Sequence, residues 1–348
     1  MGSVWKKVTL ATTAVVVVCS AWITWNRVFE VEAEPRLTYK HMDGKPSSSN
    51  LLLEIPIYGE IMVDASDPSL FWSNEATYSA HIEKLLKQAG EDSRVKGILL
   101  RLNTGGGSAT GSDAIYNALT NYRKSTQNPV VAYIEEESMS GGVMSMMGAD
   151  AIYAAPGSNI GSIGVLGDTF FAFDGITSYT VDGTEGSITS DNGVERIVIS
   201  AGKGKDFSKS YRKATIEERK TWQENVDDTY DRFVKLVSKS RNIPEKTIRE
   251  KVGAYYFGNK QAEKLKLIDG TKSWDEAIVD LAKRAKIEDF RLVRAKEPSS
   301  GLPWNFGGAQ TLTYEQKMQM LNRDRCSTAR NSMLLYHGSM KNLCSPGN

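Results

Sequence analysis

The chain has 348 residues, 40% of them hydrophobic and 24% charged, which is typical of a globular protein with one large domain or two small ones. Because 43 Lys and Arg residues offset 42 Asp and Glu residues, the net charge of +1 gives no indication of binding to nucleic acid or to a strongly charged substrate. Cys19, Cys326 and Cys344 are too few and too widely spaced to predict a disulfide framework or a metal site.

The N-terminal region predicts a membrane anchor. Residues 8–25 are apolar and nearly uncharged, and about 18 helical residues are just enough to cross the core of a bilayer. Lys6 and Lys7 precede this run, so the N-terminus is expected in the cytoplasm and the rest of the chain across the membrane. A cleaved signal peptide is the alternative, although no small-x-small cleavage site follows the run. We expect an uncleaved anchor at residues 1–29 and a polar linker at residues 30–50.

Alternating strands and helices are predicted from residue 51 onward. Short apolar runs indicate strands and amphipathic stretches indicate helices. Their alternation predicts an α/β fold with repeated parallel β-α-β units and a C-terminal helical region. The predicted strands cover residues 51–63, 97–103, 129–134, 151–154 and 290–293, and the predicted helices cover residues 78–89, 112–122, 140–148, 215–240 and 274–285, with a further short helix from Pro244.

Two segments lack a regular pattern, one within the predicted domain and one after it. Residues 168–193 have no helical period and are rich in Gly, Thr and Asp, which predicts a hairpin or a mobile insertion. Beyond Pro298 the composition turns to Ser, Gly, Asn and scattered Met. We therefore expect a domain at residues 51–297 and a poorly ordered tail, or a partner-binding extension, at residues 298–348.

The first candidate site is the segment NTGGGS at residues 103–108, which follows a predicted buried strand. Its glycines allow a sharp turn with outward N–H groups, as in an oxyanion hole or a phosphate cradle. The phosphate interpretation is weak because neither common glycine-rich phosphate pattern is present. A simple tight turn is the structural alternative.

The second candidate site is SMSGG, at residues 138–142, where a strand hands over to a helix. A serine at this point lies at the positive end of the helix dipole, which stabilises developing negative charge. Ser140 is therefore a candidate nucleophile, and a helix N-cap is the structural alternative. The side chains of Val143 and Met144 follow it and either line an apolar substrate pocket or pack against the sheet.

A serine nucleophile needs a base. None of the three histidines, His41, His81 and His337, has a catalytic setting. A lysine serves as a base when burial lowers its pKa toward neutrality. The best glycine-rich turn with lysines is SAGKGKD at residues 200–206, which contains Lys203 and Lys205.

Several ordered motifs over residues 52–285 resemble the signal peptide peptidase A family of bacterial membranes, which are Ser/Lys peptidases with a ClpP/crotonase-like fold. NTGGGS resembles the family's Asn-Thr-Pro-Gly-Gly-Gly turn, with Gly105 in the place of proline. SMSGGVMSM resembles its nucleophile turn, and SNIGSIGV its Thr-Gly-Ser-(Leu/Ile)-Gly-Val segment. SAGKGKD resembles Ser-Gly-x-x-Lys-Asp, and YYFGNKQAEKLKLID resembles a late Gly-x-x-Ala segment that ends in Asp.

The resemblance implies a role for each matching residue. Ser140 would be the nucleophile, and Lys205 the general base with Lys203 as the runner-up. Ser162 would bind the lysine, and the N–H groups of Gly107 and Gly141 would form the oxyanion hole. No metal or organic cofactor is expected.

The resemblance also implies partners and a location. Peptides such as remnant signal peptides or other short hydrophobic segments are the expected substrates, and nucleic acid is not expected. Homo-oligomers with active sites at protomer contacts are expected, in the bacterial cytoplasmic membrane with the catalytic domain outside the cytoplasm.

Other functions stay open at this point. The altered NTGGGS turn and the insertion at residues 168–193 are compatible with a catalytically silent scaffold of the same fold. Crotonase-type chemistry on acyl-CoA uses the same oxyanion geometry, and a phage capsid-maturation protease belongs to the same family. The predicted anchor argues against both of these last two.

Overall fold

The computed structural model describes residues 37–64, 76–167, 179–180, 187–188, 203, 214–296 and 334–336. Contacts divide the chain into residues 1–37 and residues 38–348, and every element named below belongs to the second part. The predicted anchor at residues 8–25 lies outside the described residues. Among the helices that are described, none combines the length and the hydropathy needed to cross a bilayer.

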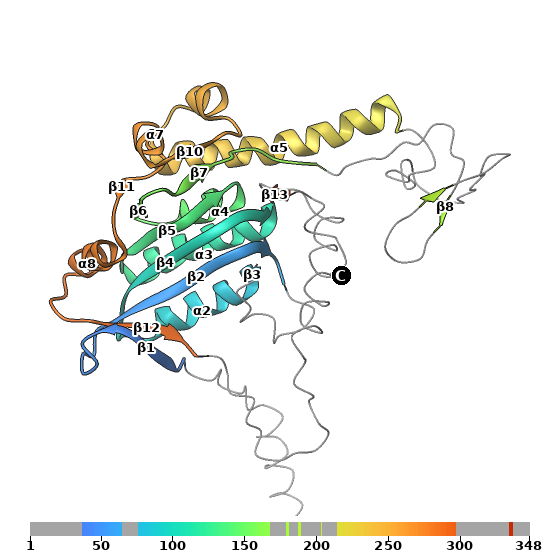
Figure 1. Cartoon of the computed structure of the whole chain (residues 1–348). Helices are drawn as coiled ribbons and strands as arrows, with labels where there is room; N and C mark the ends of the chain where they lie inside the picture. Colours follow the sequence, from blue (N-terminus) through green and yellow to red (C-terminus); the bar gives the residue numbers. More distant parts are fainter. Residues whose placement is uncertain are drawn as a thin grey trace, which may run out of the picture. The chain divides into compact units, whose positions relative to one another are not determined.

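An eleven-stranded mixed sheet forms the centre of the molecule (Figure 1). Its main path runs β1-β12-β2-β4-β5-β6-β11, and the central strands β2, β4, β5 and β6 pair in parallel. The strands of this sheet are β1 Tyr39–Gly44, β2 Leu51–Met62, β3 Ala76–Tyr78, β4 Val95–Ser108, β5 Val130–Met139, β6 Ala151–Ala154, β7 Asn159–Gly161, β10 Tyr256–Gly258, β11 Gly270–Thr271, β12 Arg291–Ala295 and β13 Leu334–Tyr336.

Helices connect and cover these strands (Figure 1). They are α2 Ser79–Glu91, α3 Ala109–Thr126, α4 Gly141–Met146, α5 Ile216–Arg241, α6 Glu245–Thr247, the π-helix η2 Ile248–Val252, α7 Asn259–Lys264 and α8 Trp274–Arg284. The predicted α/β fold is therefore confirmed. Its sheet is mixed rather than wholly parallel, because β1, β10 and β13 pair antiparallel with β12, β7 and β4 and are not parts of β-α-β units.

Two segments outside the predicted domain core contribute strands. The residues predicted to be a linker include β1, which pairs with β12 at the edge of the sheet. This strand was missed because its sequence YKHMDG exposes most side chains and has no apolar alternation. In the predicted tail, residues 334–336 form β13. Within residues 168–193, β8 Tyr179–Thr180 and β9 Ser187–Ile188 pair antiparallel as a hairpin would, and the rest of that segment lies outside the described residues.

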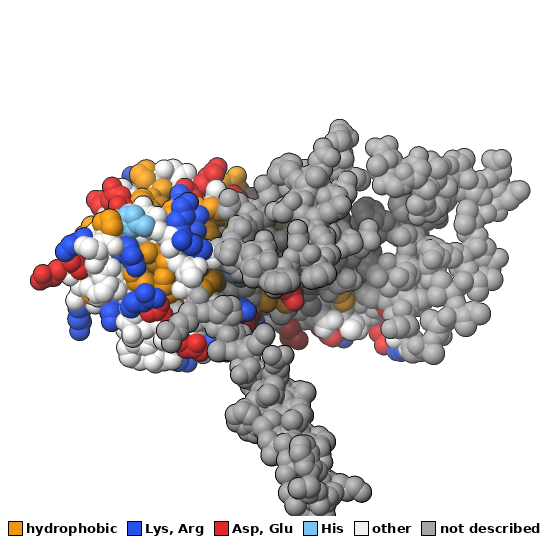
Figure 2. Space-filling model, turned by 90° about the horizontal axis from the view of Figure 1, so that it is seen from below, with side chains coloured by type: hydrophobic (Ala, Val, Ile, Leu, Met, Phe, Trp, Pro, Cys, Tyr) orange, Lys and Arg blue, Asp and Glu red, His pale blue; other side chains and the backbone are white. Residues whose placement is uncertain are grey.

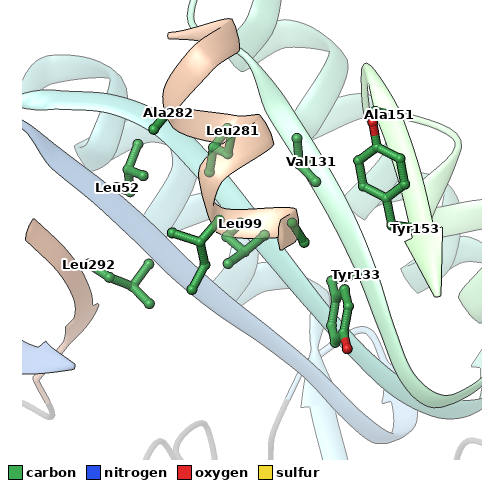
Figure 3. Close-up of a cluster of buried hydrophobic side chains, with 11 residues drawn as sticks. Leu52, Leu99, Val131, Tyr133, Ala151, Tyr153, Leu281, Ala282 and Leu292 are labelled. Atoms are coloured by element: carbon green, nitrogen blue, oxygen red, sulfur yellow. The ribbon is translucent and has the colours of Figure 1, made fainter. Parts of the chain in front are cut away.

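One face of the sheet packs under α8 (Figure 3). Leu281 of α8 and its neighbours on the same helix contact side chains from β2, β4 and β5. Because side chains alternate along a strand, Leu53 and Leu100 point to the opposite face, the side on which α2 and α3 lie (Figure 1). The α8 side of this core contains Leu52, Leu99, Val131, Tyr133, Ala151, Tyr153, Ala277, Ile278, Leu281, Ala282 and Leu292.

The same face carries a charged cluster further along the strands. Arg101 on β4 donates to Glu54 on β2, at 3.3 Å, and to Glu135 on β5. Arg294 donates to the same Oε1 atom of Glu54, and Tyr58 donates to Glu135 at 2.8 Å. Although burial opposes it, the hydrogen bonds from Arg101 and Tyr58 hold the pKa of Glu135 below its usual range. The Glu54 side chain is only 1% exposed, and Arg101 and Arg294 are its ion-pair partners.

The long helix α5 is buried only in its second half. A capping box at Thr215 and Glu218 fixes its start, and Ile216 beside it is 79% exposed. The buried side chains of α5 are Phe233, Val234, Leu236 and Val237. The surface seen in Figure 2 intersperses Lys and Arg with acidic and hydrophobic side chains, in keeping with the balanced charge of the sequence.

Candidate active site

The candidate nucleophile Ser140 stands at the point where β5 ends and α4 begins. Its backbone has φ 51° and ψ −112°, a conformation that non-glycine residues rarely adopt. Such strain persists only where the surroundings impose it, and it is common at functional sites. A serine held on a strained turn between a strand and a helix is also the form of the nucleophile elbow of other hydrolases.

Main-chain contacts hold Ser140 on both sides. Its N–H donates to the carbonyl of Gly161 on β7 at 2.8 Å. Its own carbonyl accepts the N–H of Met144 at 3.1 Å, which forms the first turn of α4. The Ser140 hydroxyl lies 3.4 Å from the carbonyl of Gly164, a long hydrogen bond, and the residue is 1% exposed. The backbone is thus fixed more tightly than the hydroxyl.

Ser162 lies directly beside the nucleophile. β7 pairs in parallel with β5, with Gly161 opposite Met139, so Ser140 and Ser162 are the residues that directly follow these two neighbouring strands. Ser162 also has a positive φ of 57° and is 7% exposed, and its N–H donates to the carbonyl of Tyr255 at 2.6 Å. The structure therefore brings together two strained, buried serines that are 22 residues apart in the sequence.

The glycine-rich segment lies on the neighbouring strand. We predicted a turn at residues 103–108, but the segment continues β4 to Ser108. Gly106 and Gly107 have φ values of 103° and 153°, which favour glycine. A Cβ on Gly107 would come within 2.2 Å of the Ile61 carbonyl oxygen, so only glycine lets β2 approach this closely. The predicted turn was wrong because glycine here serves close strand contact rather than a reversal of the chain.

The edge of this glycine segment pairs with another part of the chain. β5 leaves β4 after the pair Thr104–Ser138, and beyond that point β13 pairs antiparallel with β4. Leu335 stands opposite Gly107, between the pairs Leu334–Ser108 and Tyr336–Gly106. The segment that we predicted to form the oxyanion hole is therefore an edge on which an extended backbone forms a strand pair.

Of the remaining predicted site residues, the structure describes Gly141, Val143 and Met144 but not Lys205. Gly141 is the first residue of α4 and is buried. Its N–H belongs to the peptide that joins it to Ser140. Val143 and Met144 are 0% and 1% exposed, packed within the domain, and a role in a substrate pocket stays a prediction. Lys205 lies outside the described residues, and its role also stays a prediction.

Lys203, the runner-up base, is described. Its ammonium pairs with Glu217 at 2.5 Å, and its side chain is 82% exposed. This setting is the opposite of the apolar burial that a neutral lysine base needs. The described surroundings of Lys203 therefore lack the apolar burial expected of a catalytic lysine. The described residues also contain no group of three His, Cys, Asp or Glu side chains able to hold a metal ion.

Sequence reasoning missed two residues that shape this site. Gly161 accepts the Ser140 N–H, and its φ of 141° together with close contact to the Tyr255 backbone requires glycine. Thr104, in the glycine-rich segment itself, is buried and packs against Gly142 of α4. Both fall inside motifs that we had singled out, NTGGGS and SNIGSIGV. No sequence signal identified their contacts, because each depends on strands that are distant in the sequence.

Comparison with known proteins supports the interpretation of this site as that of a serine peptidase. Residues 122–288 match the model of Peptidase family S49. The chain is 27% identical over 255 residues to a putative signal peptide peptidase SppA of Enterococcus faecium, covering 73% of this chain and 70% of that protein. It is also 27% identical over 207 residues to Protease 4 of Salmonella typhi, covering 60% of this chain and 31% of that protein.

Among solved structures, ClpP1 from Listeria monocytogenes aligns with a TM-score of 0.37 and 13% identity, over 64% of this chain and 94% of that one. The family match and the named relatives place the chain in the class of serine proteases. The resemblance predicted from the motifs is confirmed by the match to Peptidase family S49 and by the relatives named signal peptide peptidase SppA and Protease 4.

Proposed function

We propose that the chain is a membrane-anchored serine endopeptidase that uses a Ser/Lys dyad to cleave remnant signal peptides or other short hydrophobic peptides. Ser140 is the nucleophile, Lys205 the general base, and Ser162 the partner of the lysine amine. The anchor at residues 1–29 holds the catalytic domain on the outer side of a bacterial cytoplasmic membrane, and copies of the chain assemble with active sites at their contacts.

In the proposed reaction, the Ser140 hydroxyl oxygen attacks the carbonyl carbon of the scissile peptide while neutral Lys205 accepts the hydroxyl proton. The N–H groups of Gly107 and Gly141 stabilise the negative charge on the carbonyl oxygen. When the C–N bond breaks, protonated Lys205 gives its proton to the leaving amine. Water, deprotonated by the same amine, then hydrolyses the acyl-enzyme and regenerates Ser140.

The observation that carries the proposal is the strained backbone of Ser140 beside that of Ser162. Two main-chain hydrogen bonds, to Gly161 and from Met144, hold the nucleophile at a positive φ where a strand meets a helix. A structural N-cap would not need this strain, since N-cap residues are normally extended and accept a hydrogen bond with the side chain, which Ser140 does not do.

The pairing of β13 with the glycine segment supports a peptide as the substrate. An extended peptide binds many proteins by adding a strand to a free sheet edge, with main-chain hydrogen bonds that are independent of side-chain identity. The edge from Gly106 to Ser108 pairs with residues 334–336 in this way. A substrate that pairs along this edge in place of residues 334–336 would lie near the end of β5, which Ser140 directly follows.

Labelling with a fluorophosphonate probe tests the proposal. We expect the full-length protein in detergent to be labelled, Ser140→Ala to give no labelling, and Lys205→Ala to slow labelling by about 10²–10⁴-fold, the usual contribution of a general base. Ser145→Ala is the matched control, because Ser145 is buried one helical turn away with its hydroxyl bonded to the Gly141 carbonyl, and it should label like the wild type.

Three outcomes would contradict parts of this proposal. Labelling that survives in Ser140→Ala would place the nucleophile elsewhere. Loss of labelling in Lys203→Ala with full labelling in Lys205→Ala would exchange the two lysines. A folded wild type that labels with no serine probe would favour the catalytically silent scaffold.

A further inference from the structure

The ladder between β2 and β4 is interrupted just before the glycine segment. Tyr58 pairs with Asn103, but the next pair joins Glu60 to Gly106. Gly59 alone therefore stands opposite Thr104 and Gly105, which is the arrangement of a β-bulge. Bulges re-aim the residues that follow them, and here those residues are Gly106 and Gly107.

The hydroxyl of Thr104 joins the two strands at this bulge. It donates to the Gly59 carbonyl at 2.5 Å and accepts the N–H of Gly106 at 3.0 Å. Thr104 is 1% exposed, so water does not substitute for these bonds. One hydroxyl thus satisfies the carbonyl of Gly59, which stands opposite the bulge, and fixes the Gly105–Gly106 peptide, which directly precedes the peptide that carries the Gly107 N–H.

The methyl group of Thr104 contacts the helix that carries the nucleophile. A Cβ built on Gly142 would lie 2.7 Å from the Thr104 Cγ2 atom, so the start of α4 packs directly against this methyl group. On the main chain, Thr104 pairs with Ser138, two residues before Ser140. A single buried side chain therefore contacts both segments that would supply the oxyanion hole.

We propose that Thr104 is a positioning residue of the active site. Its hydroxyl holds the Gly105–Gly106 peptide and thereby orients the next peptide, which carries the Gly107 N–H, and its methyl group sets the separation between this segment and the start of α4. This inference rests on the proposed function, and it adds a residue to the reaction rather than a step.

Two substitutions separate the roles of the hydroxyl and of the methyl group. Thr104→Val keeps the shape but leaves the Gly59 carbonyl and the Gly106 N–H without their partner. We expect kcat for a quenched fluorogenic hydrophobic peptide to fall by about 10–100-fold with KM nearly unchanged, since small displacements of catalytic groups cost up to about 10²-fold. Thr104→Ser keeps both hydrogen bonds and should recover most of kcat, within about fivefold of the wild type.

Thr77→Val is the matched control. Thr77 on β3 is also buried, and its hydroxyl accepts the Tyr58 N–H at 2.8 Å and donates to the Tyr58 carbonyl at 2.9 Å. The substitution therefore removes an equivalent pair of hydrogen bonds from the same strand, β2, without contact to Gly106. We expect it to lower the free energy of unfolding as much as Thr104→Val does, while kcat stays at the wild-type value.

A wild-type kcat in Thr104→Val would overturn the inference, as would an equal loss of kcat in Thr77→Val. If Thr104→Val does not fold, Thr104→Ala removes the same hydroxyl without a branched side chain, and the same outcomes apply. The proposed function fails separately: there the wild type is inactive, or Ser140→Ala retains activity. Activity that depends on Ser140 but not on the Thr104 hydroxyl contradicts only this inference.

Discussion

The two halves of the β4–β5 pair are built in opposite ways. In the first half, residues 98–102 pair in unbroken register with residues 130–134. In the second half the register shifts between Leu102 and Thr104, and Ser140 just beyond it has a positive φ. The regular half is mostly apolar and buried, with Arg101 as its one charged residue, whereas the irregular half leads directly into Gly107 and Ser140. This contrast teaches that one pair of strands has two roles. The regular register of the first half holds the two strands rigidly together, and the register shift in the second half changes the direction of the backbone at Gly107 and Ser140.

The largest effect is expected at Gly107 in the irregular half. In Gly107→Ala the new Cβ would meet the Ile61 carbonyl oxygen at 2.2 Å, so β2 and β4 must separate and the N–H of Gly107, the proposed oxyanion donor, must move. We expect fluorophosphonate labelling to slow by about 10²–10³-fold, the usual cost of losing one oxyanion donor. Gly258→Ala is the control, since a Cβ there meets nothing within 4 Å. Labelling of Gly107→Ala at the wild-type rate would remove Gly107 from the site.

The next effect concerns stability in the regular half. Leu100 is 0% exposed in β4, so Leu100→Ala leaves a cavity and should lower the free energy of unfolding by about 3 kcal/mol. Urea denaturation measures this change. Labelling of the folded fraction should keep the wild-type rate, because the frame persists. A large fall in that rate would show that the two halves are not separable.

A smaller effect is expected in the charged cluster around Glu54, to which Arg101 of the regular half belongs. Arg101→Met leaves the buried Glu54 with Arg294 as its remaining cation and should destabilise the fold by about 2 kcal/mol. Arg232→Met is the matched control, because Arg232 pairs with Asp113 while 57% exposed, and such surface pairs contribute at most about 1 kcal/mol. Equal losses in the two variants would contradict the structural role given to the cluster.

The smallest effect is a pH dependence from α2, the helix that precedes β4. Burial, and then the nearby charge of Lys84, lower the pKa of His81 from 6.5 to about 4. The folded state therefore favours neutral His81, and this contribution is complete above pH 6.5 and is lost as pH falls toward 4. We expect His81 to account for about 1–2 kcal/mol of the stability lost between pH 7 and pH 4, after allowance for partial exposure.

Urea denaturation of His81→Gln across this pH range checks the assignment. The variant should lose less stability on acidification than the wild type. A His81→Gln profile parallel to that of the wild type would assign the acid sensitivity to other groups.

The regular half was predictable from the sequence, and the irregular half was predictable only in part. Apolar runs such as GILLRL predict a buried strand because burial requires them, and SMSGG predicted the handover at Ser140 correctly. The continuation of β4 through Gly107 was not predicted, because glycine signals a turn locally and only contact with Ile61 explains its presence. The bridge made by Thr104 depends on a hydrogen bond to Gly59 on β2, 45 residues away, which no local pattern encodes.

The central claim is that the Ser140 hydroxyl supplies the oxygen that attacks the peptide carbonyl. The most direct measurement is peptide mapping by mass spectrometry of the full-length protein after reaction with a fluorophosphonate. We predict one covalent adduct, on the hydroxyl of Ser140. A stoichiometric adduct on another residue, with Ser140 unmodified, would contradict the claim.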